Sequence, residues 1–223
     1  MTLLLAVGLL AWGTVVAVDL VTVPQGLLSR PLVAATVAGW MAGSVIAGLV
    51  AGAVLELYAL EVLPIGAARY PDDGPGAVAA GAAAALIPGA SAIGVAGLVG
   101  LPLGLLGGVS LHLHRRRNAQ SVGANLARVA AGDARAIWDL QRNGLLRDMR
   151  RGAILSAMGL VAAWLVHLVP WDHVAHRHLL DWAVLAGGLA AGIGGAARSA
   201  GTGARRRWLA VGLATGLLVV LWR

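Results

Sequence analysis

The sequence contains no cysteine, no lysine and no phenylalanine. Without cysteine the chain can form no disulfide, offers no thiol nucleophile and binds no metal through a thiolate. Its 17 basic residues are all arginine, against 10 acidic residues, which gives a net charge of +7. The arginines cluster at the ends of apolar segments, where membrane topology places them, so their excess does not indicate a nucleic-acid-binding protein.

The signatures of two enzyme classes are also missing. No serine stands in a G-x-S-x-G elbow and no G-x-x-x-x-G-K-[ST] loop occurs, which removes the common motifs of a serine hydrolase and of a nucleotide-driven pump. Glu56 and Glu61 would lie about 140° apart on a helix, so they do not form an acid/base pair unless the helix breaks between them. We predict no catalytic residue and no cofactor in this chain.

Apolar residues, in contrast, are abundant. Hydrophobic residues make up 59% of the chain and charged residues 12%, with a mean hydropathy of +0.81. Several apolar runs reach spanning length, which predicts an all-α, polytopic membrane protein. The first run, residues 2–23, has no basic residue before it and no small-residue cleavage site before Asp19, so we interpret it as a retained span and not as a secretory signal.

Two further apolar runs are too long for one crossing. Residues 32–63 would extend about 48 Å as a single helix, against a hydrocarbon core of about 30 Å, so this run must tilt steeply, break or fold back. Pro31 predicts a break just before it. Residues 77–113 contain Pro88 and Pro102, which predict two short or discontinuous segments. Within the first run, two small-residue pairs predict close helix packing: Gly39 with Gly43, and Gly48 with Gly52.

The polar stretch that follows is rich in arginine. Arg128, Arg135 and Arg142 recur every seven residues opposite an apolar face, which predicts an amphipathic helix over about 125–141 on the cytoplasmic headgroups. Simpler spans are expected at 153–169, 180–197 and 208–222. The arginine clusters at 115–117, 147–151 and 205–207 orient these spans, with the loop 170–181 outside.

We therefore predict a single membrane-embedded domain over residues 1–223. Residues 1–113 would form broken helices with the substrate site, 114–151 a cytoplasmic amphipathic linker, and 152–223 the C-terminal spans.

Glu56 is the first candidate for a functional residue. An ionisable side chain deep in an apolar segment is expensive unless it is paired or neutralised, so it indicates a site by default. The alternative is a structural carboxyl that is protonated or paired with arginine. Function is favoured because the same block ends in a second polar cluster, P-I-G-A-A-R-Y-P-D-D-G-P-G, residues 64–76.

In that cluster, Asp72 and Asp73 follow a proline and precede glycines, so carboxylates and peptide groups could be held beside a cavity. Carboxylates suit sugar hydroxyls because each accepts several charge-assisted hydrogen bonds. A turn with two solvated aspartates is the plainer alternative. A third polar group consists of Asp19, Gln25, Ser29 and Arg30, in which Gln25 faces either substrate or backbone and Arg30 either serves the site or pairs structurally.

Histidines form one short cluster. His173, His176 and His178 could reach one metal together with Asp172, but the cluster lies in a predicted outer loop between two tryptophans that look like interfacial anchors, Trp171 and Trp182. A metal-free loop is the preferred interpretation.

Two stretches, S-R-P-L-V-A-A-T-V-A-G-W-M-A-G-S-V-I-A-G-L-V-A-G-A-V-L-E-L-Y-A-L and P-I-G-A-A-R-Y-P-D-D-G, carry a family resemblance. They resemble the IIC subunit of the mannose-fructose-sorbose class of the bacterial phosphoenolpyruvate-dependent sugar phosphotransferase system. The shared features are an initial Arg-Pro-Leu, a Gly-rich segment that ends in Glu-Leu, and then Gly-Ala-Ala and Pro-Asp. Ser44 stands where family members commonly have Asp.

The resemblance implies a permease subunit that translocates a hexose or hexosamine in the bacterial inner membrane. It implies a IID membrane partner, cytoplasmic IIA and IIB components that carry the phosphoryl group, assembly into a larger oligomer, and an elevator-like movement. It assigns sugar contact to Glu56 and Asp72, and also to Gln25 and the backbone of Ile65, Gly66 and Ala67. A non-transporting sensor or regulatory protein that kept the fold is the alternative.

Overall fold

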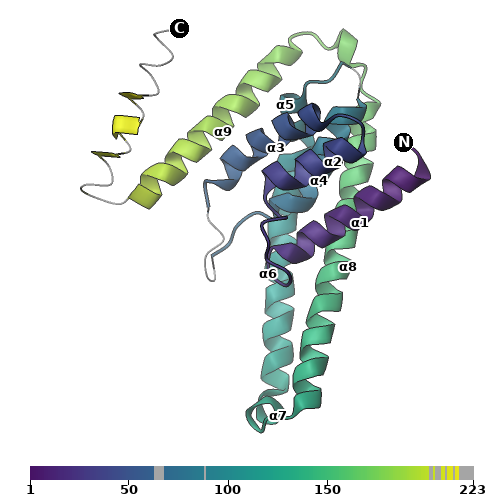
Figure 1. The fold of residues 1–223 in the computed structure, drawn as a ribbon, viewed down its shortest axis with the longest axis vertical. Coiled ribbons are helices and arrows are strands. Elements are labelled where there is room, and N and C mark those ends of the chain that lie inside the picture. Colours follow the sequence, from purple (N-terminus) through teal and green to yellow (C-terminus); the bar gives the residue numbers. More distant parts are fainter. Residues whose placement is uncertain are drawn as a thin grey trace.

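The structure is a computed structural model that describes residues 1–62, 68–87, 89–200, 203, 207–208, 210–212 and 214–215. Regular structure in these ranges is helical, without a strand. A body of packed helices carries two projections, a long hairpin and the helix α9 (Figure 1). The elements of the body are α1 (Leu3–Asp19), α2 (Pro31–Met41), α3 (Val45–Ala59), α4 (Asp73–Leu86), α5 (Ala92–Val95) and a π-helical turn (Ala96–Gly100). The remaining elements are α6 (Leu101–Ala124), α7 (Leu126–Ala130), α8 (Ala134–His167), a short 3₁₀ turn (Trp171–His173) and α9 (Arg177–Ala200).

Helix α4 forms the centre of the body. Ten consecutive residues of this helix, 74–83, are buried, and nearly all of them are glycine or alanine. Small side chains let neighbouring backbones approach closely, which is the main source of helix association where no water is displaced. α4 accordingly packs against α1, α2, α3, α6 and α8.

Residues 32–63 break and fold back, as the length of this run predicts. α2 and α3 are joined through Gly43, whose φ of +100° favours glycine, and the Ser44 hydroxyl caps α3 by accepting from the Ala47 N–H at 3.3 Å. The close packing predicted for Gly39 and Gly48 is confirmed, since a Cβ on Gly39 would stand 2.6 Å from the Gly48 Cα. Gly43 is instead the turn residue.

The prediction of a break at Pro102 is wrong. α5, the π-helical turn and α6 form one continuous helix, Ala92–Ala124, of 33 residues. Pro102 is the second residue after the π-helical turn, where the hydrogen-bond pattern is already shifted, so the missing proline N–H is tolerated. The break near Pro88 is confirmed because α4 ends at Leu86 and the next helix begins at Ala92, although Pro88 itself lies outside the described residues.

The single amphipathic helix predicted over 125–141 is also wrong. The chain turns at residues 131–133, where Gly132 has φ +72° and the Asp133 carboxylate caps α8 by accepting from the Arg135 and Ala136 N–H groups. The Ala136 N–H and the Arg128 guanidinium lower the pKa of Asp133. The seven-residue arginine repeat continues across Gly132 and the capping residue Asp133, so it does not mark a single helix. α6 and α8 therefore form a hairpin that projects from the body, with α7 at its tip (Figure 1).

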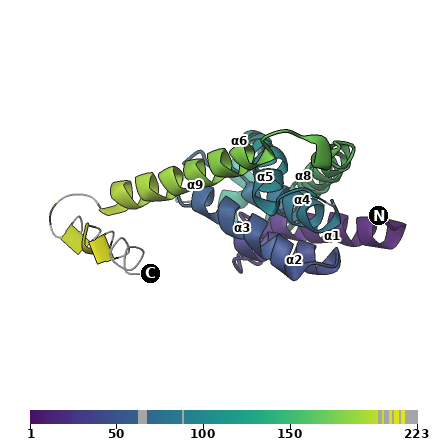
Figure 2. The same cartoon turned by 90° about the horizontal axis from the view of Figure 1, so that it is seen from above.

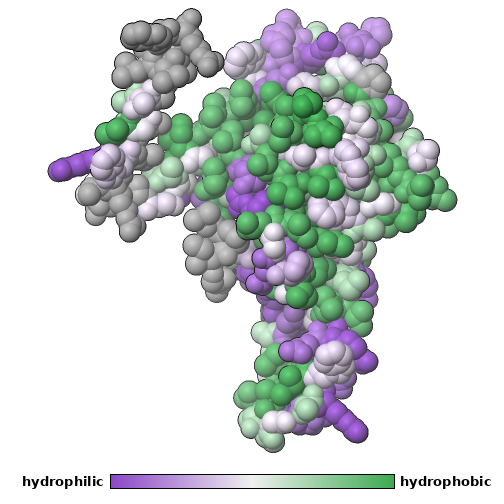
Figure 3. Space-filling view, viewed as in Figure 1, coloured by the Kyte–Doolittle hydropathy of each residue, from purple (hydrophilic) through white to green (hydrophobic). Residues whose placement is uncertain are grey.

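Three helices of the described chain are long and apolar enough to cross a membrane: Ala92–Ala124, Ala134–His167 and Arg177–Ser199. The spans predicted at 153–169 and 180–197 lie largely within the second and third, whereas the one at 208–222 lies mostly outside the described residues. Figure 3 shows apolar side chains over the body, with hydrophilic side chains gathered above it and along the hairpin below. This distribution is that of a membrane protein.

Helix α9 leaves the body at an angle and contacts it along α3 and α5 (Figure 2). The Tyr58 hydroxyl donates to the Val184 carbonyl at 2.7 Å, and Gly187 and Gly188 face the Tyr58 ring. Near the end of the helix, Arg198 bonds the Glu61 carbonyl at 2.8 Å. Trp171, predicted as an interfacial anchor, is instead buried and donates its indole N–H to the Val166 carbonyl.

Candidate functional site

A cavity of about 570 Å³ lies where the end of α1, the loop before α2, the residues before α4 and the middle of α6 meet. Its volume falls in the range of about 300–1,000 Å³ that is usual for small-molecule sites. Apolar residues line part of it, among them Leu20 and Val21 directly after α1, Pro31 of α2 and Ala59 of α3. The polar residues that line it are Asp19, Gln25, Ser29, Arg30, Tyr70, Asp73, His114, Arg115 and Asn118.

Asp19 shapes the loop that carries Gln25. Its carboxylate is only 1% exposed and accepts from the Gly26 N–H at 2.6 Å and the Ser29 N–H at 2.9 Å. The loop between α1 and α2 is thereby folded back onto the end of α1. Gln25, with φ +58°, is held in this loop at the cavity wall.

Arg30 and Glu56 form an ion pair beside the cavity. The Arg30 Nε donates to Glu56 Oε1 at 2.7 Å, and the Leu32 N–H donates to Glu56 Oε2 at 3.2 Å. Glu56 thus joins the end of α3 to the start of α2. Arg30 lines the cavity, whereas Glu56 stands behind it.

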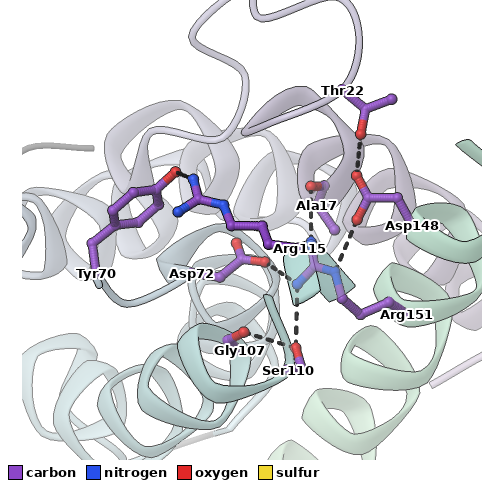
Figure 4. A network of polar contacts seen from close by, with 9 residues as sticks. All are labelled: Ala17, Thr22, Tyr70, Asp72, Gly107, Ser110, Arg115, Asp148 and Arg151. Carbon is purple, nitrogen blue, oxygen red and sulfur yellow. Dashed lines mark hydrogen bonds and ion pairs between the residues drawn. The ribbon is translucent and has the colours of Figure 1, made fainter. Parts of the chain in front are cut away.

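Asp72 belongs to a buried ion network (Figure 4). Its fully buried carboxylate accepts from Arg151 Nη1 at 2.5 Å, and the same guanidinium donates to Asp148 at 2.8 Å and to the Ala17 carbonyl at 3.2 Å. Thr22 donates to the other Asp148 oxygen. The network fixes the turn before α4 against α1 and α8, so it determines where the next residue, Asp73, is placed.

Asp73 and Arg115 supply charge to the cavity wall. Asp73 directly follows Asp72 at the start of α4 and lines the cavity. Arg115 lies over the Tyr70 ring, 4.8 Å from its centroid, and donates to the Tyr70 hydroxyl and to the Ala68 carbonyl.

The wall is completed by His114 and Asn118, whose ring and amide nitrogens are 2.9 Å apart. Carboxylate, guanidinium, amide and imidazole groups together supply donors and acceptors for a polyhydroxylated ligand.

The structure brings some of the sequence-predicted residues together at this cavity. Gln25 lines it, while Glu56 and Asp72 lie one layer behind, each bonded to an arginine. The predicted backbone contacts of Ile65, Gly66 and Ala67 lie outside the described residues.

Sequence reasoning missed several residues of the wall. The sequence analysis uses Arg115 only for membrane orientation and gives His114 no role at a site. It also uses Arg151, which supports the cavity through Asp72, only for orientation. One available signal was the i, i+3 spacing of Asp148 and Arg151, which puts both charges on one helix face.

The histidine cluster shows no metal site. Within the described ranges, no group of three or more His, Asp or Glu side chains is arranged to hold a metal ion. His176 and His178 contact each other edge to face, with ring centroids 5.8 Å apart, and Asp172 lies 3.6 Å from Arg177.

Comparisons with known proteins identify the family and the fold. The family described as "PTS system sorbose-specific iic component" matches residues 1–194. A solved structure described as "Structure of membrane protein" superposes with a TM-score of 0.72 at 21% sequence identity, covering 99% of this chain and 91% of that one. A comparison with curated proteins finds no match.

Proposed function

The chain belongs to the family of sorbose-specific IIC components of the phosphotransferase system, and from this premise we propose that its cavity binds a hexose or hexosamine for transport across the bacterial cytoplasmic membrane. The observation that carries the proposal is the cavity of about 570 Å³ with Gln25, Asp73, Arg115 and Asn118 on its wall. A sugar needs hydrogen-bond donors and acceptors on several sides at once, and this wall offers both.

The acidic residues take different roles in this proposal. Asp73 and Gln25 contact the sugar hydroxyls directly. Glu56 acts by orienting Arg30 at the cavity edge, and Asp72 acts by fixing the turn that presents Asp73. Sugar contact by the backbone of residues 65–67 remains a prediction from the sequence.

The partners follow from the same premise. We propose that a IID subunit completes the membrane assembly and that cytoplasmic IIA and IIB components phosphorylate the sugar as it is released. An oligomer of IIC and IID subunits is expected. The chain itself supplies binding and passage, and the phosphoryl chemistry resides in its partners.

Sugar binding by the purified protein tests the proposal directly. Titration of mannose, fructose, sorbose and glucosamine, followed by calorimetry, should reveal binding of at least one sugar. Asp73→Asn should weaken that binding about 10- to 100-fold, because a charge-assisted hydrogen bond to a hydroxyl contributes roughly 1.5–3 kcal/mol. Asp139→Asn, an exposed change on α8, is the matched control and should leave binding unchanged. Equal affinities for the two variants would remove Asp73 from the site.

Uptake separates a transporter from a sensor. Vesicles that contain this chain with its IID, IIA and IIB partners should accumulate labelled sugar, and Glu56→Gln should reduce uptake while the protein still inserts. Sugar binding without uptake in the complete assembly would instead support the non-transporting alternative.

A further inference from the structure

A second cavity lies in the groove between α6 and α8. Its volume is about 330 Å³. One end is lined by apolar side chains of both helices, and the other end by Arg117, Arg147 and Arg150. The groove therefore changes from apolar to cationic along its length.

On both helices the residues that line the groove change from apolar to cationic toward the hairpin tip, although the helices are antiparallel. On α6, Leu106, Val109 and Leu113 precede Arg117 at helical spacing, so they form one stripe. On α8 the corresponding stripe runs backwards along the chain, from Met158 through Ile154 to Arg150 and Arg147. Each stripe covers eleven residue steps, or about 16 Å at 1.5 Å per residue, which is close to half of a hydrocarbon core of about 30 Å.

Of the four arginines that line the groove, Arg117, Arg147 and Arg150 have no acidic partner among the described residues. The ion pairs of the described chain include Arg151, bound to Asp72 and Asp148, but none involves Arg117, Arg147 or Arg150. Arg147 donates only to neutral oxygens, those of Asn118 and Ser121. No Asp or Glu is among the described residues that line the groove. This end of the groove therefore offers an anion three guanidinium groups with no competing carboxylate among the lining residues.

At the opposite end of the groove, exposed apolar side chains favour an apolar ligand group packed over them. Val109 is 62% exposed, Ile154 54% and Met158 44%. A free inorganic anion would satisfy the arginines and leave this stripe bare, whereas a molecule with an acyl chain attached to a phosphate satisfies both ends. Basic pockets between membrane helices are known to recognise anionic lipid headgroups.

We propose that this groove is a binding site for an anionic phospholipid. One acyl chain lies along the stripe that begins at Leu106 and Met158, and the phosphate is held by Arg117, Arg147 and Arg150. Guanidinium suits this role because its planar donors bind phosphate oxygens in pairs.

Native mass spectrometry of the purified chain tests the site. The protein is released from mixed micelles that contain equal amounts of phosphatidylglycerol and phosphatidylcholine, and the retained lipid is counted. The unaltered chain should retain phosphatidylglycerol preferentially. The double variant Arg117→Gln/Arg150→Gln should retain at least about tenfold less, because two charge-assisted contacts are lost. Neither arginine has another ion pair within the described ranges, so this variant should fold.

The control variant Arg116→Gln/Arg135→Gln removes the same charge from exposed positions outside the groove and should retain lipid like the unaltered chain. Arg117→Lys/Arg150→Lys keeps the charge but loses the paired donors, so it should restore only part of the retention. Glycerol 3-phosphate and inorganic phosphate, which lack the acyl chain, should not displace the lipid. Equal retention by the two glutamine variants, displacement by either soluble phosphate, or equal retention of both phospholipids would overturn the proposal.

Discussion

Arg151 connects three segments of the chain besides its own helix. Its guanidinium contacts Asp72 before α4, Ala17 at the end of α1 and Ser110 on α6, in addition to Asp148 on α8. The side chain is only 8% exposed. These three charges are removed from water, so each is stabilised mainly by the opposite charge beside it. Loss of one would leave the others uncompensated.

Arg151→Met should therefore destabilise the protein strongly. It leaves Asp72 and Asp148 as buried carboxylates without a cation, and removal of one partner of a buried ion pair costs about 3–5 kcal/mol. Unfolding of the purified protein in detergent, followed by circular dichroism, measures the loss. Arg116→Met, at an exposed position, is the control and should change stability by less than about 0.5 kcal/mol. Similar unfolding midpoints for the two variants would contradict a structural role for the network.

The ion pairs of Glu56 and Asp72 are contacts whose partners the sequence does not identify. The cost of burying Glu56 correctly indicates that it must be paired or used, but the sequence alone does not select Arg30 as its partner, because that contact joins residues 26 positions apart. The contact between Asp72 and Arg151 spans 79 positions. The first pair follows from the packing of α2 against α3 and the second from the packing of α4 against α8, which no local pattern specifies.

At the scale of elements, the α2–α3 hairpin depends on glycine. A Cβ on Gly48 would collide with the Ala35 carbonyl and with Gly39, and both obstacles are backbone atoms that cannot rotate away. Neither helix is long enough to cross a core of about 30 Å, since α2 has 11 residues and α3 has 15. Their stability therefore comes from each other and from α4.

Gly48→Ala should destabilise the protein by about 1–3 kcal/mol, the usual cost of overpacking. Gly144→Ala is the matched control. Gly144 lies within α8 and a Cβ there would meet only the Asn118 amide nitrogen, at an ordinary distance of 3.8 Å, so this change should preserve or raise stability. Thermal unfolding of both variants in the same detergent gives the comparison, and a Gly48→Ala midpoint at or above that of Gly144→Ala would disprove the close packing.

The elements were predicted unequally well. The length of the apolar run 32–63 predicts that it breaks or folds back, because a single helix of this length would exceed the thickness of the hydrocarbon core. Periodicity failed at 125–141 because the arginine repeat continues across Gly132 and Asp133, whose cap signal ends one helix and begins the next. The break predicted at Pro102 is absent for a different reason, since the π-helical turn before this residue accommodates the missing proline N–H.

At the scale of the whole molecule, the long helices determine topology. α8 contains 34 residues, or about 51 Å of helix, so its two ends lie on opposite sides of a core of about 30 Å. The hairpin end carries many arginines and few acidic residues. The positive-inside rule therefore predicts that α7 faces the cytoplasm and that the turn at 171–173 faces outward.

Labelling of single cysteines checks this orientation, and the absence of native cysteine means that no background variant is needed. Ala131→Cys, at the hairpin tip, should react with a membrane-impermeant maleimide only in inside-out vesicles. Val174→Cys, beyond α8, should react only in right-side-out vesicles. Both positions are exposed, so reaction of both from the same side would refute the predicted topology.

The contact of α9 with the body has a mechanical consequence. On the α9 side this contact presents Gly187, Gly188 and Gly195, which let α3 approach closely, while Val184 reaches into the buried core of the body. The described hydrogen bonds across it lie toward its two ends, at Tyr58 and at Arg198. A displacement of α3 would therefore have to carry α9 with it or break both kinds of contact.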